Sequence, residues 1–213
     1  MNRNKLAVNL FLGFVKLTGI LPALILLKPK VWLKKGAKRR LPAPSILVSN
    51  HASLLDFVLY LCVFPFRTVR FLMAEVLFNK GRLFAKFLGL IGGIEVDRDA
   101  FDFSFVSDCI EVLDNKGILG IFPQGRLPVG DTVFPFTAST AYIAKNADAP
   151  IIPVYTDGNY GLFKRANVVI GEPFYITDFL KEDESEAESL KRLTEIIESK
   201  VYELKDEIKK GSN

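Results

Sequence analysis

The chain has 213 residues, 49% of them hydrophobic, and a formal net charge of +4. This length fits one domain, or one domain with an appendage, and is long enough to bury a full core. A single histidine, His51, and two separated cysteines, Cys62 and Cys109, argue against a zinc site. Both cysteines lie in apolar helical patterns, which is typical of reduced core residues and favours the cytosolic side of a membrane.

The predicted elements begin with an apolar segment at residues 6–27, interrupted by Gly13, Lys16, Gly19 and Pro22. A helix needs about 20 predominantly apolar residues to span a bilayer, so this segment is marginal. Because Pro22 should kink or split it, the pattern favours two short helices lying in the membrane interface. A cleaved signal peptide is disfavoured, since no small-x-small cleavage site is present. A helical hairpin that packs on the core remains an alternative.

A basic run follows the apolar segment. It contains seven basic residues and no acid: Lys28, Lys30, Lys34, Lys35, Lys38, Arg39 and Arg40. Beside an apolar segment, such a run indicates an anionic membrane surface before it indicates nucleic acid. We therefore predict that residues 1–40 are membrane-associating helices, and that residues 41–213 are an α/β domain with a C-terminal amphipathic helix. The expected location is the cytoplasmic face of a membrane.

After a proline-containing turn at residues 41–44, short apolar runs alternate with helical patterns. Strands are predicted at Ser45–Ser49, Val69–Met73, Ile91–Val96, Ile118–Phe122, Ile151–Val154 and Val168–Gly171. Helices are predicted at Ser53–Phe64, Val76–Leu88, Ser104–Asn115 and Thr137–Asn146, and from about Glu184 to Ile208. This alternation is typical of an α/β fold with a mostly parallel central sheet flanked by helices.

His51 comes directly after the first of these strands, and Asp56 follows it closely. No other unperturbed side chain changes charge near pH 7, so His51 is the leading candidate for a general base. Both residues would lie at the carboxyl edge of the sheet, where open α/β folds bind ligands. Asp56 would then orient the imidazole and stabilise its charged form. The alternative is a capping box, because Ser53 and Asp56 have its spacing, and spacing alone favours that alternative.

Two further segments at strand ends carry candidate substrate-binding residues. Arg98 is suited to binding a phosphate, and its alternative is a surface arginine paired with a neighbouring aspartate. Gly125 lets the backbone approach a ligand, and Arg126 supplies positive charge. Residues 120–126 are not a P-loop, because they lack the Lys-Ser/Thr pair and contain Pro123.

Four motifs follow one another along the chain. They are Asn-His-Ala-Ser-Leu-Leu-Asp at residues 50–56, Val-Asp-Arg at 96–98, Phe-Pro-Gln-Gly at 122–125 and Pro-Ile-Ile-Pro-Val at 150–154. Together they resemble the glycerolipid acyltransferases of the 1-acylglycerol-3-phosphate acyltransferase (PlsC-like) family, over about residues 41–175. The resemblance implies that His51 and Asp56 are the catalytic pair and that Arg98 binds phosphate.

The third motif departs from the family pattern Phe-Pro-Glu-Gly-Thr-Arg. Gln124 stands where the family has glutamate, and Arg126 lies one position earlier than the family's arginine. Glutamine keeps the volume and the hydrogen bonding but loses the negative charge. The departure therefore bears on which molecule accepts the acyl group more than on the class of reaction.

The resemblance implies a membrane-associated O-acyltransferase. It would move a fatty acyl group from acyl-CoA or acyl carrier protein to the hydroxyl of a lysophospholipid such as 1-acylglycerol-3-phosphate. The substrate-binding residues would be Arg98, Gln124, Gly125 and Arg126. No bound cofactor, metal or nucleic acid is expected, and the partners are anionic membrane lipids and the two substrates. Attack would be direct, since no Gly-x-Ser-x-Gly motif is present.

Two alternative functions stay open on the sequence. A thioesterase or lysophospholipase would use the same His51–Asp56 pair with water as the acceptor. A non-catalytic lipid-binding protein with a degenerate site is the other alternative, and Gln124 is the residue that keeps it open.

Overall fold

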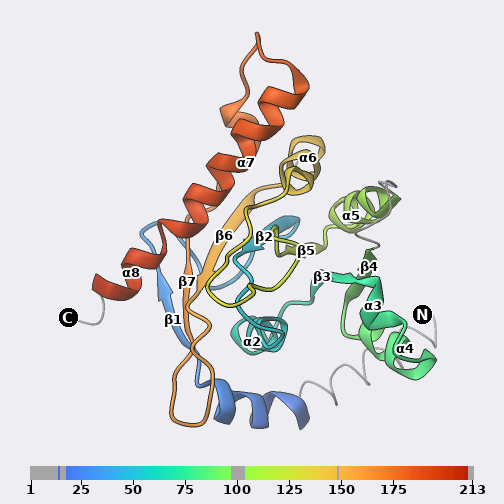
Figure 1. Cartoon of the computed structure of the whole chain (residues 1–213), viewed down its shortest axis with the longest axis vertical. Helices are drawn as coiled ribbons and strands as arrows, with labels where there is room; N and C mark the ends of the chain where they lie inside the picture. The colour runs from blue at the N-terminus through green and yellow to red at the C-terminus, as the bar shows by residue number, and fades with distance from the viewer. Residues whose placement is uncertain (1–13, 15–17, 97–103, 148, 211–213) are drawn as a thin grey trace.

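The computed structural model describes residues 14, 18–96, 104–147 and 149–210. One seven-stranded sheet forms its centre, in the order β1-β7-β6-β2-β5-β3-β4 (Figure 1). The strands are β1 (Lys30–Leu33), β2 (Ser45–Ser49), β3 (Val69–Ala74), β4 (Gly93–Val96), β5 (Ile118–Ile121), β6 (Ile151–Thr156) and β7 (Asn167–Ile170). Strands β2 to β6 pair in parallel, and only the β6–β7 pairing is antiparallel. The predicted α/β fold with a mostly parallel sheet is confirmed.

Helices cover both faces of the sheet. They are α2 (Asp56–Val63), α3 (Glu75–Phe78), α4 (Arg82–Leu90), α5 (Ser104–Asp114), α6 (Ala138–Asn146), α7 (Glu186–Tyr202) and α8 (Lys205–Lys210), with a 3-10 turn, η1 (Ile176–Phe179). Residues 18–27 are also helical. In Figure 1, α6 and α7 lie on one side of the strands, and α2 and the helix at residues 18–27 lie on the other.

Alternate side chains of the central strands enter two separate cores. Ile46 and Val48 of β2 pack in the core with α5, α6 and α7, whereas Leu47 packs in the core with α2 and the end of the 18–27 helix. This two-sided burial is why β2 reads as a continuous apolar run rather than an alternating one. The parallel pairing of β2 with β5 and β6 sets the sheet edge at which residue 50 begins the next loop.

The N-terminal segment is described only in part. Residues 1–13 and 15–17, where much of the predicted membrane segment falls, lie outside the described residues. Within the described part of the chain, no helix combines the length and the apolar character needed to cross a bilayer. Residues 30–33, which the sequence placed with the membrane-associating helices, form β1 and pair with β7.

Two predicted helices are each divided in the structure. The segment predicted at Val76–Leu88 forms α3 and α4, separated by a turn in which Gly81 has φ +143°. An L-residue with a side chain rarely adopts that backbone conformation, so the glycine ends one helix and starts the next. The C-terminal helix is likewise divided into α7 and α8, although its predicted apolar stripe is buried at Leu193, Ile197, Val201 and Leu204.

Candidate active site

The His51 loop joins β2 to α2 at the carboxyl edge of the sheet. Strands β5 and β6 lie on either side of β2 and run parallel to it. The segments that follow β5 and β6 therefore reach the same edge as the His51 loop. Asn50 links this loop to β6 by two backbone contacts: its side-chain amide donates to the Thr156 carbonyl and accepts from the Thr156 N–H, both at 2.9 Å. These two hydrogen bonds hold the start of the loop against β6.

Asp56 is the first residue of α2, directly after this loop, and is fully buried. Its Oδ2 lies 2.8 Å from His51 Nδ1, and accepts from the backbone N–H groups of Ala52 at 2.7 Å and Ser53 at 2.9 Å. Its Oδ1 accepts a hydrogen bond from the Tyr160 hydroxyl. A buried carboxylate is costly unless it is paired and hydrogen-bonded, and these donors meet that requirement.

Only one of the two hydrogen bonds of the alternative capping box is formed. Asp56 reaches back to the Ser53 N–H, as a capping box requires, but the Ser53 hydroxyl accepts from the Leu55 N–H at 3.2 Å instead of capping Asp56. Helix α2 has no side-chain N-cap. The same carboxylate therefore shapes the loop and contacts the imidazole.

Two contacts hold the imidazole of His51, and a third holds its backbone. Nδ1 contacts Asp56, the ring stacks on Phe122 with centroids 4.3 Å apart, and the backbone N–H donates to Gln124 Oε1 at 2.6 Å. If Nδ1 carries the proton toward Asp56, Nε2 is left with a free lone pair. Among the described residues, no group bonds to Nε2. With its side chain 14% exposed, the ring can receive a substrate proton from outside.

Tyr160 completes the site and was not predicted. It lies in the loop after β6, far from Asp56 in the chain, and its hydroxyl also lies 3.2 Å from Thr156 Oγ1. Burial first, and then the negative charge of Asp56, raise the pKa of Tyr160 well above its usual value. It therefore stays a hydrogen-bond donor to Asp56. No local pattern in the sequence marks this tyrosine.

Gln124 lies beneath His51 rather than in the open site. Its side chain is 4% exposed, and its Nε2 donates to the Tyr202 hydroxyl of α7 at 3.2 Å. Because a backbone N–H can only donate, Oε1 must face His51. Gln124 thus connects the His51 backbone to α7, a positioning role that sequence spacing did not indicate.

The structure describes two of the other three predicted substrate-binding residues, Gly125 and Arg126. Gly125 forms a turn with φ +65°, its N–H donating to the Phe122 carbonyl at 3.0 Å, which explains the glycine by backbone conformation. Arg126 is exposed, with its guanidinium 5.1 Å from the centre of the Phe134 ring. Arg98 lies outside the described residues.

An apolar cavity of about 290 Å³ lies on the α2 side of the sheet. It is lined by the helix at residues 18–27, by α2 and by α4, and includes Phe57, which directly follows Asp56. Cys62 also lines it, and both cysteines are free and buried. Burial raises the pKa of the Cys62 thiol, and burial followed by the charge of Asp108 raises that of Cys109 to about 12, so neither thiol is activated as a nucleophile.

Comparison with protein families identifies the class of this chain. The family model described as Acyltransferase matches residues 33–157, more than half of the chain. The chain belongs to the acyltransferase family. The matched range includes His51 and Asp56, so the resemblance carried by the four motifs is confirmed, and this acyltransferase is an enzyme of phospholipid biosynthesis.

Individual relatives of this acyltransferase agree with the family. The chain is 27% identical over 192 residues to a 1-acyl-sn-glycerol-3-phosphate acyltransferase of Bacillus subtilis (strain 168), covering 86% of this chain and 94% of that protein. It is 30% identical over 112 residues to the human 1-acyl-sn-glycerol-3-phosphate acyltransferase beta, covering 52% of this chain but 40% of that protein.

The fold also matches a solved structure. The crystal structure of the 1-acyl-sn-glycerophosphate (LPA) acyltransferase PlsC from Thermotoga maritima superposes with a TM-score of 0.66 and 24% identity. The match covers 96% of this chain and 84% of that one. At this identity, the likeness shows a shared fold.

Proposed function

We propose that this acyltransferase moves a fatty acyl group from an acyl thioester, acyl-CoA or acyl carrier protein, to the hydroxyl of a lysophospholipid such as 1-acylglycerol-3-phosphate. The names of the Bacillus subtilis and human relatives support this substrate class. The single observation that carries the proposed mechanism is the contact between His51 Nδ1 and Asp56 Oδ2, which leaves Nε2 able to act as a base.

In this mechanism the His51 Nε2 takes the proton from the acceptor hydroxyl as its oxygen attacks the thioester carbonyl carbon. The carbon–oxygen bond forms, the carbon–sulfur bond breaks, and the leaving thiolate takes the proton from the imidazolium. Asp56 stabilises that imidazolium without moving, because its oxygens are already fixed by Ala52, Ser53 and Tyr160. A positioned general base of this kind contributes roughly 10²- to 10⁴-fold to the rate.

Substrate binding is proposed to use both charge and apolar surface. Arg126 is a candidate for the acceptor phosphate, because it is exposed and its loop also carries Phe122, on which His51 stacks. Arg98 remains a candidate from its motif. The apolar cavity along α2 suits an acyl chain, since Phe57 at its wall directly follows Asp56.

We also propose that the protein associates with the cytoplasmic face of a membrane. On the helix at residues 18–27, Leu21 and Ile25 are 61% and 66% exposed, and most of the following basic run is exposed as well. Apolar side chains beside lysines and arginines suit the boundary between headgroups and acyl chains. The free cysteines Cys62 and Cys109 fit a reducing compartment.

The proposed reaction is tested by offering acyl-CoA and acyl carrier protein thioesters in turn, with and without a panel of lysophospholipids in detergent micelles. We expect thioester cleavage to depend on the lysolipid and to yield the diacyl product. Equal cleavage without any lysolipid would instead identify a thioesterase. Lysolipid breakdown without a thioester would identify a lysophospholipase.

A further inference from the structure

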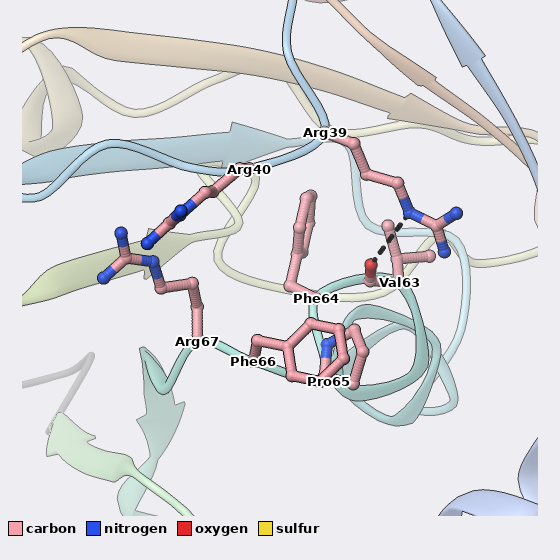
Figure 2. A pocket seen from close by; sticks show the side chains of 7 residues that line it. All are labelled: Arg39, Arg40, Val63, Phe64, Pro65, Phe66 and Arg67. Atoms are coloured by element: carbon pink, nitrogen blue, oxygen red, sulfur yellow. Dashed lines mark hydrogen bonds between the residues drawn. The ribbon is translucent and has the colours of Figure 1, made fainter.

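A second cavity lies at the opposite edge of the sheet from His51. It has a volume of about 650 Å³ and is lined by Arg39, Arg40, Val63, Phe64, Pro65, Phe66 and Arg67. These residues come from the segment before β2 and from the turn between α2 and β3, so they meet at the amino ends of these strands (Figure 2). His51 follows the carboxyl end of β2, so this cavity is separate from the active site.

The charges of this cavity are not balanced within the described part of the chain. Arg39 makes a long hydrogen bond from Nε to the Val63 carbonyl at 3.5 Å, at the end of α2 where helix carbonyls are free. Arg40 and Arg67 have no carboxylate partner among the described residues. Figure 2 shows their side chains extending to the same side of the cavity, while Arg39 extends to the other.

A third cavity, smaller than this one, is lined by the same two arginines. It has a volume of about 340 Å³, and Arg40 and Arg67 line it together with Lys38. Two guanidinium groups on one cavity repel each other unless an anion lies between them. Guanidinium forks match the oxygens of a phosphate, to which they donate paired hydrogen bonds.

The same cavity has an apolar rim. Phe66 is 96% exposed, whereas Phe64, two positions before it, is 3% exposed and forms part of the core. Phenylalanine is among the side chains by which interfacial segments enter the boundary between lipid headgroups and acyl chains. An exposed aromatic side chain next to Arg67 therefore points to a ligand with a charged head and an apolar body.

We propose that Arg40 and Arg67 bind the phosphate of an anionic membrane phospholipid, with Phe66 inserted beside its glycerol backbone. The lipid bound here anchors the enzyme and is not the acyl acceptor. Helix α2 joins the two sites, with Asp56 at its start and Val63 at its end, so eight residues of helix set them about 12 Å apart along its axis. The cavity thereby fixes how α2 and the His51 site lie against the membrane.

This inference rests on the proposed membrane association but not on the proposed reaction. Acyl transfer in detergent micelles, where no bilayer needs to be bound, reports on the reaction alone. Binding to vesicles without any substrate reports on the anchor alone. Failure of one is therefore distinguishable from failure of the other.

The test is sedimentation of the full chain with vesicles of pure phosphatidylcholine and with vesicles of equimolar phosphatidylcholine and phosphatidylglycerol. We expect the protein to prefer the anionic vesicles, and the Arg40→Gln/Arg67→Gln variant to bind them roughly 30-fold more weakly, since one cation near such a surface contributes about fivefold. Its acyl transfer in micelles and its circular dichroism should match the wild type. No preference for anionic vesicles, or unchanged binding by the variant, would overturn the proposal.

Lys191→Gln/Lys205→Gln is the matched control, because it removes two exposed charges from α7 and α8 on the other face of the sheet. It should lower binding by less than about threefold, since charges beyond a Debye length are screened. An equal loss of vesicle binding in both double variants would show general electrostatic attraction to the anionic surface, and would overturn a specific site at Arg40 and Arg67. Arg40→Lys/Arg67→Lys keeps the charge but not the fork, so wild-type binding by that variant would also overturn it.

The source of the phosphate is tested by competition. Glycerol 3-phosphate and inorganic phosphate should not displace the protein from anionic vesicles at concentrations matching the lipid, because neither offers an apolar body to Phe66. Displacement that depends on Arg40 and Arg67 would assign the cavity to a soluble phosphate ester and overturn the lipid assignment.

Discussion

At the scale of single residues, the Asp56 carboxylate depends on Tyr160 as its only donor from outside its own loop among the described residues. We predict that Tyr160→Phe lowers kcat about tenfold with little change in the KM for lysolipid, because a hydrogen bond to a charged group contributes about 1.5–3 kcal/mol. Tyr175→Phe, at an exposed tyrosine, is the control. A variant that loses only thermal stability, with kcat unchanged, would limit Tyr160 to a structural role.

Gln124 is the residue whose expected role the structure changes most. The family resemblance implied contact with the substrate, but its carboxamide is buried between the His51 backbone and Tyr202. We predict that Gln124→Leu lowers the free energy of unfolding by about 1–3 kcal/mol, because it leaves the His51 N–H unsatisfied. Urea denaturation measures this loss.

The conservative variant separates positioning from substrate contact. Gln124→Glu offers an acceptor to the His51 N–H and to the Tyr202 hydroxyl, so we expect it to keep more activity than Gln124→Leu. Within each variant, turnover should change by the same factor for every lysolipid headgroup. A changed order of preference among headgroups would place Gln124 in the acceptor site after all.

At the scale of elements, the sequence predicted the central strands well because their signal is local. β2 is a run of apolar residues buried on both faces, and its predicted bounds match the structure. β1 was missed because its four residues lie in a basic run, and only pairing with β7, far along the chain, makes them a strand. For the same reason the sequence could point to His51 and Asp56, which share one short motif that resembles the family's, whereas Tyr160 and Tyr202 reach the site from distant elements.

Helix α7 carries Tyr202 and begins with a capping box formed by Ser185 and Glu188. We predict that Ser185→Ala lowers the free energy of unfolding by about 1 kcal/mol, the usual contribution of an N-cap. Ser199→Ala, at an exposed position in the same helix, should change it by less than about 0.5 kcal/mol. Equal effects in chemical denaturation would show that the cap does not stabilise this helix.

At the scale of the whole molecule, the boundary expected at residue 40 does not coincide with the edge of the sheet. Leu27 is fully buried and β1 is paired with β7. We predict that deleting residues 1–40 lowers the urea midpoint markedly, because it removes both Leu27 and β1. If the shorter chain is as stable as the full one, β1 is dispensable to the fold.

The central claim is that His51 is the general base of acyl transfer, and single-turnover kinetics of folded His51→Ala with acyl thioester and lysophosphatidic acid tests it most directly. The chain has no second histidine that could substitute. We predict that the rate of diacyl product formation falls by roughly 10²- to 10⁴-fold while circular dichroism and the urea midpoint stay close to the wild type. A rate within a few fold of the wild type in a folded variant would contradict the mechanism.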